Sequence, residues 1–428
     1  LRKNPAQITV SATPNDGPGF CTCPRCRAWD HPEAGRGVMT ERYVTFWNIL
    51  ARGLKSRLPE REAYVGAYAY SAYREPPIDE TLEDNIAVGF VGHFPLTGEA
   101  AAKRQKAMWK AWADMATSMV FRPNLFHSSG GHRGLPNIVL DRTASSFRFL
   151  ANNKCVGIEV DTLPLCWATQ GPQYYLMTQL SYNPYQNADE VMQDYYRRGF
   201  GPAAEEIERY FALMEDATTD LLEKLWHPKG KGRRRGEAVA RAFDEIFGDK
   251  TFLEKAGTLM DRAAEKAASA PDIYQQRVAF MRKGFDFLAL RAKIKDAMKD
   301  VRESRYTDQD AAQKALALYE KRKALYKSTW ESEGHRFRYA LKIRYSEDIL
   351  EPSEMLVKAA EGISPKKGDK SGTEPFMWLA PADWKQVWHD DFRRARLGDD
   401  WEALQGNWSV QDGELVSHGG KIVSTRSF

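Results

Sequence analysis

The sequence predicts an α/β region followed by an all-α region, and three patterns in its 428 residues carry that prediction. Over residues 1–200, short apolar runs mostly alternate with amphipathic segments, which is typical of parallel strands joined by helices. Residues 201–362 hold successive amphipathic segments with a 3.6-residue period, which predicts a helical domain. A linker rich in Gly, Ser, Pro and Lys is expected over 363–382, and short alternating runs over 383–428 predict the start of a truncated β-sandwich.

The first expected strand lies in QITVSAT, at the start of residues 7–26, and leads into a glycine-rich turn. We expect this strand to be short and buried, because its residues are apolar and β-branched and are bounded by Pro and Gly. It delivers Asn15 and Asp16 to its C-terminal end, where the chemistry of strand-helix proteins usually takes place. The alternative is that Asp16 only ties the turn, as Asx residues often do.

The remaining elements of the α/β region alternate along the chain, with one exception. Between Ser71 and Asn85, prolines and acids favour a loop over a helix. Helices are expected over about 39–59, 99–116 and 141–153, and strands over about 63–71, 86–94, 117–121 and 155–163. Strands that are apolar on both faces predict a parallel sheet with helices outside it. Five strands fit the C-terminal part of a (β/α)8 (TIM) barrel whose first three strands would precede Leu1, and a small open α/β sheet is the alternative.

Composition and charge limit the classes of partner that we expect the protein to bind. The net charge of +4 is dispersed along the chain, which gives no reason to expect a nucleic-acid partner. The basic run Lys229–Glu237 is expected to be a solvated loop. No apolar run approaches the roughly 20 residues that a membrane-spanning helix needs. The chain opens at Leu1 without a signal peptide and stops inside an expected strand. We therefore expect a fragment of a longer chain, with any export signal upstream and the oligomeric state left open.

Three of the five cysteines, Cys21, Cys23 and Cys26, are crowded into a C-x-C-x2-C motif. Three thiolates with His31 or a distant residue as the fourth ligand would suit a structural zinc ion. A disulfide between two of them is equally compatible with an exported protein, and free thiols are the third possibility. A catalytic thiol is the least favoured interpretation, because no His is placed in sequence to activate one.

Two stretches together resemble a known family. The first is SATPNDGPGFCTCPRCRAWD, followed by a helix that opens with ERYVTFWN. The second is GIEVDTLPLCWATQGPQYYLMTQLSYNPYQNADEVMQDYYRRGFGPAAEEIERYF. In order and spacing they resemble a bacterial family catalogued as domain-of-unknown-function family 4838, over roughly residues 5–300. The run DDF…LGDDWE…G.WSV.DG.L near the C-terminus resembles the start of concanavalin-like sugar-binding or sugar-processing modules.

The resemblance implies a sugar-active (β/α)8 barrel followed by a helical domain. Members resemble the barrels of α-glucuronidases and β-hexosaminidases and are usually parts of large exported proteins that handle polysaccharides. We therefore expect a secreted or periplasmic glycoside hydrolase that needs no cofactor for catalysis. Its expected substrate is a glycan that contains uronic acid or N-acetylhexosamine.

Glycosidic bond cleavage needs one carboxylic acid to protonate the leaving oxygen and one carboxylate to activate water or attack directly. If the first strand is the fourth of a barrel, Asp16 is the expected acid, and Asn15 would bond a sugar hydroxyl. The second carboxylate is expected from Glu159 or Asp161, which point to the same side of the last strand. The alternative is that one of them pairs with a neighbour such as Arg122 and only fixes the sheet.

A sugar site also needs aromatic platforms and hydrogen-bond donors. The expected substrate-binding residues all come just after strands, on the face where active sites of barrels form. They are Tyr68, Tyr70, His93, Arg122, His127 and Trp167. Two other functions stay open: a carbohydrate-binding or scaffolding barrel without catalysis, and an interaction module stabilised by metal or disulfide at the three cysteines.

Overall fold

The computed structural model describes residues 7–14, 19–35, 37–125, 136–160, 166–225, 241–328 and 352–364, and the strands within 401–424. The chain divides into two compact units, residues 1–374 and 375–428. Each unit is described by itself.

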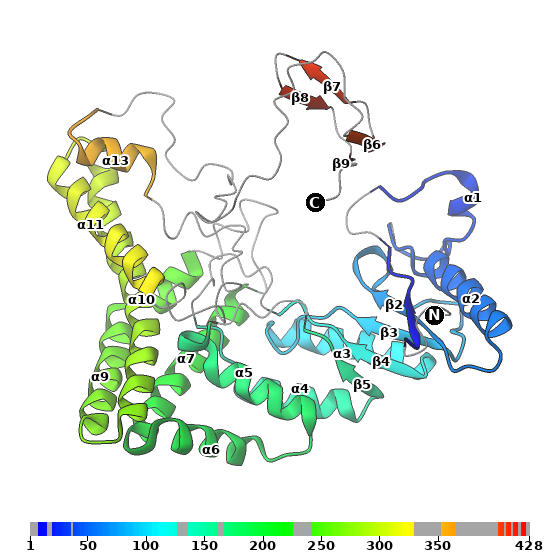
Figure 1. Cartoon of the computed structure of the whole chain (residues 1–428), viewed down its shortest axis with the longest axis horizontal. Helices are drawn as coiled ribbons and strands as arrows, with labels where there is room; N and C mark the ends of the chain where they lie inside the picture. Colours follow the sequence, from blue (N-terminus) through cyan, green and yellow to red (C-terminus); the bar gives the residue numbers. More distant parts are fainter. Residues whose placement is uncertain are drawn as a thin grey trace. The chain divides into compact units, whose positions relative to one another are not determined.

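A five-stranded parallel sheet forms the α/β part of the first unit (Figure 1). The strands are β1 (Thr9–Ser11), β2 (Tyr64–Ala69), β3 (Ile86–Phe90), β4 (Ser118–Phe121) and β5 (Cys155–Ile158). They lie in the order β1-β2-β3-β4-β5, so each strand pairs with the next one along the chain. The predicted α/β region with a parallel sheet is therefore confirmed.

The crossover helices of this sheet pack against the same face. They are α2 (Thr40–Arg57), α3 (Glu99–Met115) and α4 (Leu140–Ala151), and the short α1 (Pro24–Arg27) precedes them. Trp47 on α2 and Trp109 on α3 are fully buried in one cluster with Phe90 and Phe121 of the sheet. Because alternate residues of a strand face opposite sides, Val65, Ala67 and Ala69 of β2 are buried under the helices, while Tyr64, Gly66 and Tyr68 are only half-buried on the other face.

The expectation that the first strand is buried was wrong. The side chains of Thr9 and Ser11 are exposed and that of Val10 is half-buried. Among the described strands, β1 pairs with β2 alone, at the edge of the sheet. An apolar, β-branched run identifies a strand, but its burial depends on what packs beside it.

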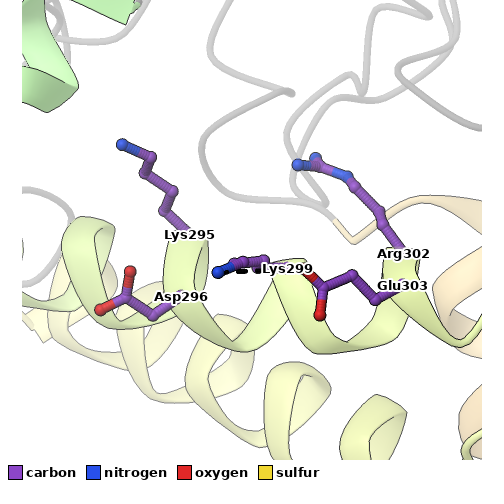
Figure 2. A pocket seen from close by; sticks show the side chains of 5 residues that line it. All are labelled: Lys295, Asp296, Lys299, Arg302 and Glu303. Carbon is purple, nitrogen blue, oxygen red and sulfur yellow. Dashed lines mark ion pairs between the residues drawn. The ribbon is translucent and has the colours of Figure 1, made fainter.

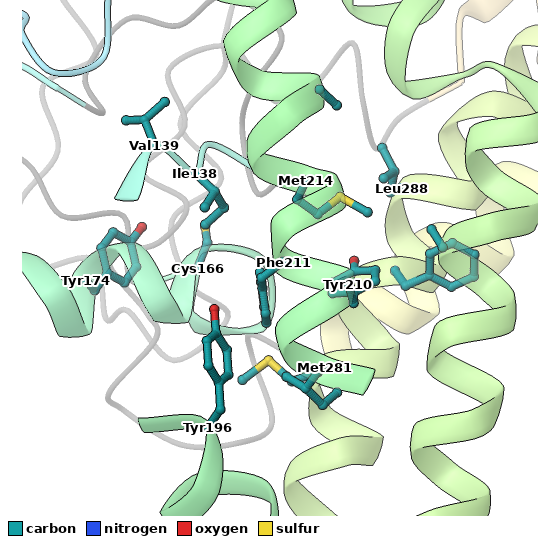
Figure 3. Close-up of a cluster of buried hydrophobic side chains, with 14 of the residues drawn as sticks. Ile138, Val139, Cys166, Tyr174, Tyr196, Tyr210, Phe211, Met214, Met281 and Leu288 are labelled. Carbon is teal, nitrogen blue, oxygen red and sulfur yellow. The ribbon is translucent and has the colours of Figure 1, made fainter. Parts of the chain in front are cut away.

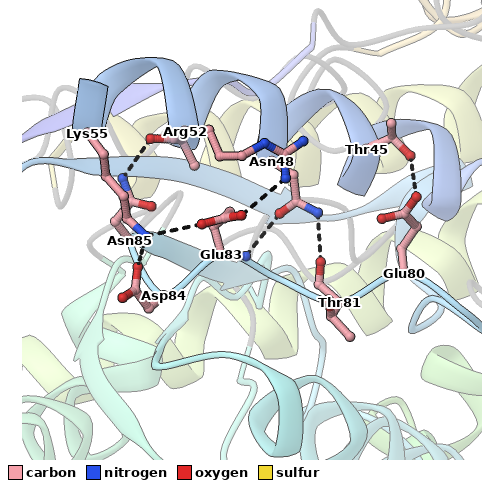
Figure 4. Close-up of polar contacts among 10 residues, drawn as sticks. Thr45, Asn48, Arg52, Lys55, Glu80, Thr81, Glu83, Asp84 and Asn85 are labelled. Atoms are coloured by element: carbon pink, nitrogen blue, oxygen red, sulfur yellow. Dashed lines mark hydrogen bonds and ion pairs between the residues drawn. The ribbon is translucent and has the colours of Figure 1, made fainter. Parts of the chain in front are cut away.

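The connection from β2 to β3 contains a 3-10 helix, η1 (Ser71–Tyr73), and otherwise an irregular segment, as predicted. Side chains of α2 tie this segment down (Figure 4). Asn48 donates to Thr81 O at 2.7 Å and accepts from Glu83 N at 2.9 Å, while Arg52 pairs with Glu83 at 3.1 Å. A loop whose backbone groups are bonded by a neighbouring helix needs no helix of its own.

Glu41, at the start of α2, holds the same segment by its carboxylate. It is 6% exposed and accepts hydrogen bonds from the backbone N–H groups of Ile78, Asp79 (2.9 Å) and Glu80 (3.0 Å). Bonds to a charged acceptor are stronger than neutral ones. Glu41 therefore fixes the path of this irregular connection.

Beyond β5 the described chain of the first unit is helical, which agrees with the predicted all-α character. The elements are α5 (Trp167–Tyr182), α6 (Ala188–Phe200), η2 (Gly201–Ala203), α7 (Ala204–Leu225), a helical stretch at 241–247, α9 (Lys250–Ala267), α10 (Asp272–Glu303), α11 (Gln309–Tyr326) and α13 (Glu354–Ala360). Side-chain oxygens cap several of these helices; Asp249, for example, accepts from Phe252 N at 2.8 Å at the start of α9.

A single hydrophobic cluster joins the α/β part to these helices (Figure 3). Ile138 precedes α4 and is buried with Tyr210 and Met214 of α7 and Met281 of α10. A Cβ atom at Gly284 would lie 2.3 Å from the carbonyl oxygen of Ala168, so glycine lets α10 approach the backbone of α5. The helices therefore share a core with the segment that leads into α4.

The second unit contains four described strands in two antiparallel pairs. They are β6 (Trp401–Gln405), β7 (Trp408–Gln411), β8 (Glu414–Ser417) and β9 (Lys421–Ser424). β6 pairs with β9 and β7 pairs with β8. Strand character in this region agrees with the sequence pattern, whereas the β-sandwich stays a prediction. No helix within the described parts of the chain is long and apolar enough to cross a bilayer.

Candidate functional site

Three of the predicted site residues, Tyr68, Arg122 and Glu159, meet at the C-terminal edge of the parallel sheet. The Tyr68 hydroxyl donates to the Glu159 carboxylate, at 3.2 Å from Oε1 and 3.4 Å from Oε2. The Arg122 guanidinium lies over the Tyr68 ring, 5.0 Å from its centre, and its Nε is 3.9 Å from Glu159 Oε1. An aromatic ring, a cation and a carboxylate from three strands therefore form one cluster.

The alternation of the strands explains why these side chains share a face. Phe121 and Ile158 are partners in the sheet, and Phe121 lies in the cluster under the helices. Arg122 and Glu159 follow them directly, and the ladder continues because Glu159 N donates to Phe121 O at 2.9 Å. One residue further along a strand turns the side chain to the opposite face, which is the face of Tyr68.

A glycine on the neighbouring strand makes room for the Tyr68 ring. Gly89 of β3 is the sheet partner of Tyr68, and a Cβ atom there would lie 2.6 Å from Tyr68 Cδ1. A side chain of any size at position 89 would thus displace the ring. The small residue in β3 therefore lets the tyrosine lie across the sheet toward β4 and β5.

The electrostatics of the cluster keep Tyr68 a hydrogen-bond donor. Partial burial raises the pKa of its hydroxyl above the ordinary value of 10, and the nearby Glu159 charge raises it further. Arg122 opposes this rise without reversing it. The Glu159 side chain is 57% exposed and that of Arg122 is 17% exposed, so the carboxylate can meet a ligand from solution while the guanidinium is held in place. Arg122 Nη1 also donates to Asn124 Oδ1 at 2.8 Å.

The other predicted site residues fall into two groups. Asn15, Asp16, His127 and Asp161 lie outside the described residues, so their predicted roles stay predictions. Tyr70, His93 and Trp167 are described, and each has contacts with other residues. Tyr70 packs 6.4 Å from the Tyr73 ring, His93 N donates to Gln105 Oε1 at 2.7 Å, and the Trp167 ring meets Tyr174 edge-on at 5.3 Å.

The three clustered cysteines converge in space as well as in sequence. The Sγ atoms of Cys21, Cys23 and Cys26 all lie within 4.8 Å of one another, close enough to hold one metal ion. All five cysteines are free thiols in this structure. Hydrogen bonding, first with the Cys26 backbone and then with the thiols of Cys21 and Cys26, lowers the pKa of Cys23 to about 7. Hydrogen bonding with the thiols of Cys21 and Cys23 raises the pKa of Cys26 to about 11.

His31 is not a fourth ligand of this cluster in the structure, which corrects one of the two options drawn from the sequence. Its Nε2 lies 2.9 Å from Asp79 Oδ2, and its Nδ1 accepts from Glu33 N at 3.1 Å. Because Nδ1 accepts, Nε2 carries the proton and donates to Asp79. Both ring nitrogens are therefore engaged, by a partner 48 residues away and by a local backbone amide.

Sequence reasoning missed one unusual carboxyl group, Glu215 of α7. Burial raises its pKa from the ordinary 4.5 to about 7, although it accepts from Asp141 N (3.1 Å) at the start of α4. In the sequence Glu215 belongs to an amphipathic helix and carries no signal that distinguishes it from solvated acids. Its role here is to receive the N-terminus of α4, which favours a nearby carboxylate.

The pocket drawn in Figure 2 does not resemble a catalytic centre. It has a volume of about 360 Å³, and its described lining residues all come from α10. They are Lys295, Asp296, Lys299, Arg302 and Glu303. Lys299 and Glu303 form an ion pair of 3.8 Å on the helix surface, with both side chains largely exposed. Such pairs are common on solvated helix faces.

Comparison with known proteins gives one family match. Residues 1–212 match the model of the family described as a domain of unknown function, DUF4838. Residues 1–212 therefore belong to this family, which confirms the resemblance drawn from the two sequence motifs over that part of the chain. No curated protein and no solved structure matches the chain.

Proposed function

We propose that this protein, whose residues 1–212 match the DUF4838 model, is a carbohydrate-active protein, and that it hydrolyses glycosidic bonds at the edge of the sheet where Tyr68, Arg122 and Glu159 meet. The observation that carries the proposal is the contact between Tyr68 and Glu159 at 3.2 Å, with Arg122 over the ring. Aromatic faces bind sugar rings, and a carboxylate beside such a face is the group that glycosidic cleavage requires.

A (β/α)8 barrel is the fold that we propose for the α/β part. Its support is the sequential order of five parallel strands together with crossover helices packed on one face. A doubly wound sheet would carry helices on both faces. A flat sheet would also place β2 and β5 about 14 Å apart, because neighbouring strands are about 4.8 Å apart. A sheet that curves toward the Tyr68 face, as a barrel does, shortens this span.

In the proposed reaction Glu159 is the nucleophile or the base, and Asp16 is the acid that protonates the leaving oxygen. Asp161 is the alternative to Glu159. The Tyr68 hydroxyl orients the carboxylate, and correct orientation of a reacting group lowers the barrier substantially. Paired-carboxylate hydrolysis needs no cofactor, so the cysteine cluster has no part in this chemistry.

The proposed substrate is a glycan with uronic acid or N-acetylhexosamine units, handled outside the cytoplasm. An anionic sugar would suit Arg122, because guanidinium groups pair well with carboxylates. This assignment extends the proposal from a reaction type to a substrate class, and it draws on the resemblance to α-glucuronidase and β-hexosaminidase barrels.

The second candidate function is carbohydrate binding without catalysis. The same three side chains would then form a binding surface, and the ion pair between Arg122 and Glu159 (3.9 Å) would mainly fix the sheet. The sequence predicts such a pairing with Arg122 as the alternative to a catalytic role. The pairing favours the binding function, because a carboxylate held by Arg122 is less available for reaction. A metal-stabilised interaction module at the cysteines is the third candidate.

The deciding experiment measures hydrolysis of a panel of uronic-acid and N-acetylhexosamine glycans by the intact protein, together with glycan affinity. We expect Glu159→Gln and Asp16→Asn to lower kcat by about 10²–10⁴-fold, the usual contribution of acid or base groups, with little change in melting temperature. Binding without turnover in the wild type would favour the binding function. If the wild type does not hydrolyse any glycan of the panel and either variant is much less stable than the wild type, the carboxylate has a structural role.

A further inference from the structure

We propose that Cys21, Cys23 and Cys26 form a zinc site that fastens the segment of residues 19–35 to helix α2. This inference goes beyond glycan hydrolysis and does not depend on it. The segment follows β1 and includes the short helix α1. Its thiols, its polar bonds to α2 and its sparse apolar packing together point to a metal.

The positions of the sulfur atoms suit a zinc ion. Zinc bonds to thiolate sulfur at about 2.3 Å with tetrahedral geometry, which places ligand sulfurs about 3.8 Å apart. The three Sγ atoms lie within 4.8 Å of one another, so a shift of about 1 Å or less would close the site. Soft thiolate ligands favour zinc over hard cations such as magnesium or calcium. A disulfide would use two of the sulfurs and leave the third unexplained, whereas a metal uses all three.

A short helical turn brings two of the cysteines together. Cys23 is the residue before α1, which begins at Pro24, and Cys26 lies within this four-residue helix. The Arg27 N–H donates to Cys23 O at 3.0 Å, which closes the turn. Cys23 and Cys26 therefore lie at the two ends of one turn.

Arg42 of α2 fastens the ligand-bearing segment from the other side. Only 9% exposed, it donates to the backbone oxygen of Cys21 at 2.8 Å and makes a two-pronged ion pair with Asp30 at 2.9 and 2.5 Å. One side chain thus binds the segment on both sides of the cysteine turn. The described residues supply three ligands, and His31 is committed to Asp79 and Glu33.

Apart from Phe20, the segment contributes little apolar packing that would order it without a metal. Helix α1 spans four residues and buries none of them. Phe20 is half-buried and touches the rings of Tyr43 and Tyr73. Isolated helices this short are unstable in water, and small modules with little core commonly depend on metal ligation. A zinc ion would supply the missing cross-link.

The test uses the whole chain, purified under reducing conditions and titrated with Zn²⁺ or with Co²⁺ as a spectroscopic probe. We expect one ion per chain and, with Co²⁺, the thiolate-to-metal charge-transfer band together with the visible bands of a tetrahedral site. Cys26→Ser should weaken metal binding by at least about tenfold, more than loss of a surrounding group does. Cys155→Ser is the matched control, because Cys155 lies in β5, outside the cluster, and this variant should bind metal as the wild type does.

A second measurement needs no variant and reports on the proposed fastening. With metal bound, amides of residues 19–35 should exchange hydrogen at least about tenfold more slowly than after chelation, while those of β2–β4 stay unchanged. His31→Gln should keep the cobalt spectrum. The proposal would be overturned by binding of less than one metal ion per chain, or by a disulfide within the cluster in unreduced protein. It would also be overturned if Cys155→Ser lost as much metal affinity as Cys26→Ser, if His31→Gln lost the cobalt spectrum, or if chelation left the exchange rates of residues 19–35 unchanged.

Discussion

The hydroxyl of Tyr68 donates to Glu159 at 3.2 Å, although β3 and β4 lie between their two strands and 91 positions separate them in sequence. This contact makes the two side chains one unit. A substitution of Tyr68 should therefore change the orientation of the Glu159 carboxylate.

Loss of the Tyr68 hydroxyl should affect activity more than stability. We expect Tyr68→Phe to lower kcat on the glycan substrate by about 10- to 100-fold, because the carboxylate loses its orienting donor. The melting temperature should fall only slightly, since one half-exposed hydrogen bond contributes about 1 kcal/mol. Tyr64→Phe is the control: Tyr64 lies on the same strand and its hydroxyl bonds to Glu62, two residues away. Equal effects of the two variants would contradict the assignment.

Gly89 should be intolerant of a methyl group, because the ring of Tyr68 occupies that space. Gly89→Ala is expected to reduce the free energy of unfolding by about 1–3 kcal/mol, the usual cost of overpacking, and to disturb the Tyr68–Glu159 bond. Chemical denaturation measures the first effect. At Gly157 of β5 a Cβ atom would meet nothing within 4 Å, so Gly157→Ala should change stability by less than about 1 kcal/mol. A similar loss in both would mean that steric crowding is not the cause.

Removal of the Glu41 carboxylate should destabilise the fold. Three backbone N–H groups would lose their acceptor in Glu41→Ala, and we expect a loss of about 2–3 kcal/mol in unfolding free energy. The exposed Glu60 offers a matched control, since Glu60→Ala should stay within about 0.5 kcal/mol of the wild type. Denaturant titrations of the pair measure both values, and a neutral Glu41→Ala would show that water replaces the carboxylate.

Glu215 should make stability fall as pH rises toward neutrality. The carboxyl group has a pKa of about 7 when folded, against 4.5 ordinarily, so between these values the folded state holds a proton that the unfolded state has released. Its contribution is fully present below about pH 4.5 and is lost as pH rises through 7.

We expect Glu215→Gln to match the wild type near pH 4.5 and to exceed it by roughly 2–3 kcal/mol at pH 8, because glutamine keeps an acceptor and has no charge to bury. Thermal or denaturant unfolding across this pH range checks the difference. Parallel stability curves for Glu215→Gln and the wild type would contradict the raised pKa of Glu215.

Much of the fold could be predicted from local patterns. The apolar runs that became β2 and β3, and the helical period around Trp109, are set by neighbours a few residues away. The helix-free connection before β3 was also predictable, since prolines and acids disfavour a helix. The exposure of β1 was not, because it depends on how few strands and helices pack against it.

The candidate site was predictable residue by residue but not as a cluster. Tyr68, Arg122 and Glu159 each lie at or just after the end of a strand, and that signal is local. Their contact depends on strand order and on the space left by Gly89, neither of which a local pattern contains. The contact of His31, one of the two options for a fourth ligand, was not predictable for the same reason: its partner, Asp79, lies in a loop that the sequence could not place beside it.

The close approach of α10 to α5 at Gly284 has a mechanical consequence. The 32-residue helix α10 packs closely on the backbone of α5 at Gly284, and both helices share one buried cluster with residues that precede α4. The sheet-bearing part and the helices after it should consequently melt together. Scanning calorimetry should show one cooperative unfolding transition for the first unit. Gly284→Ala should split this transition into two, because the added methyl group would force α10 and α5 apart.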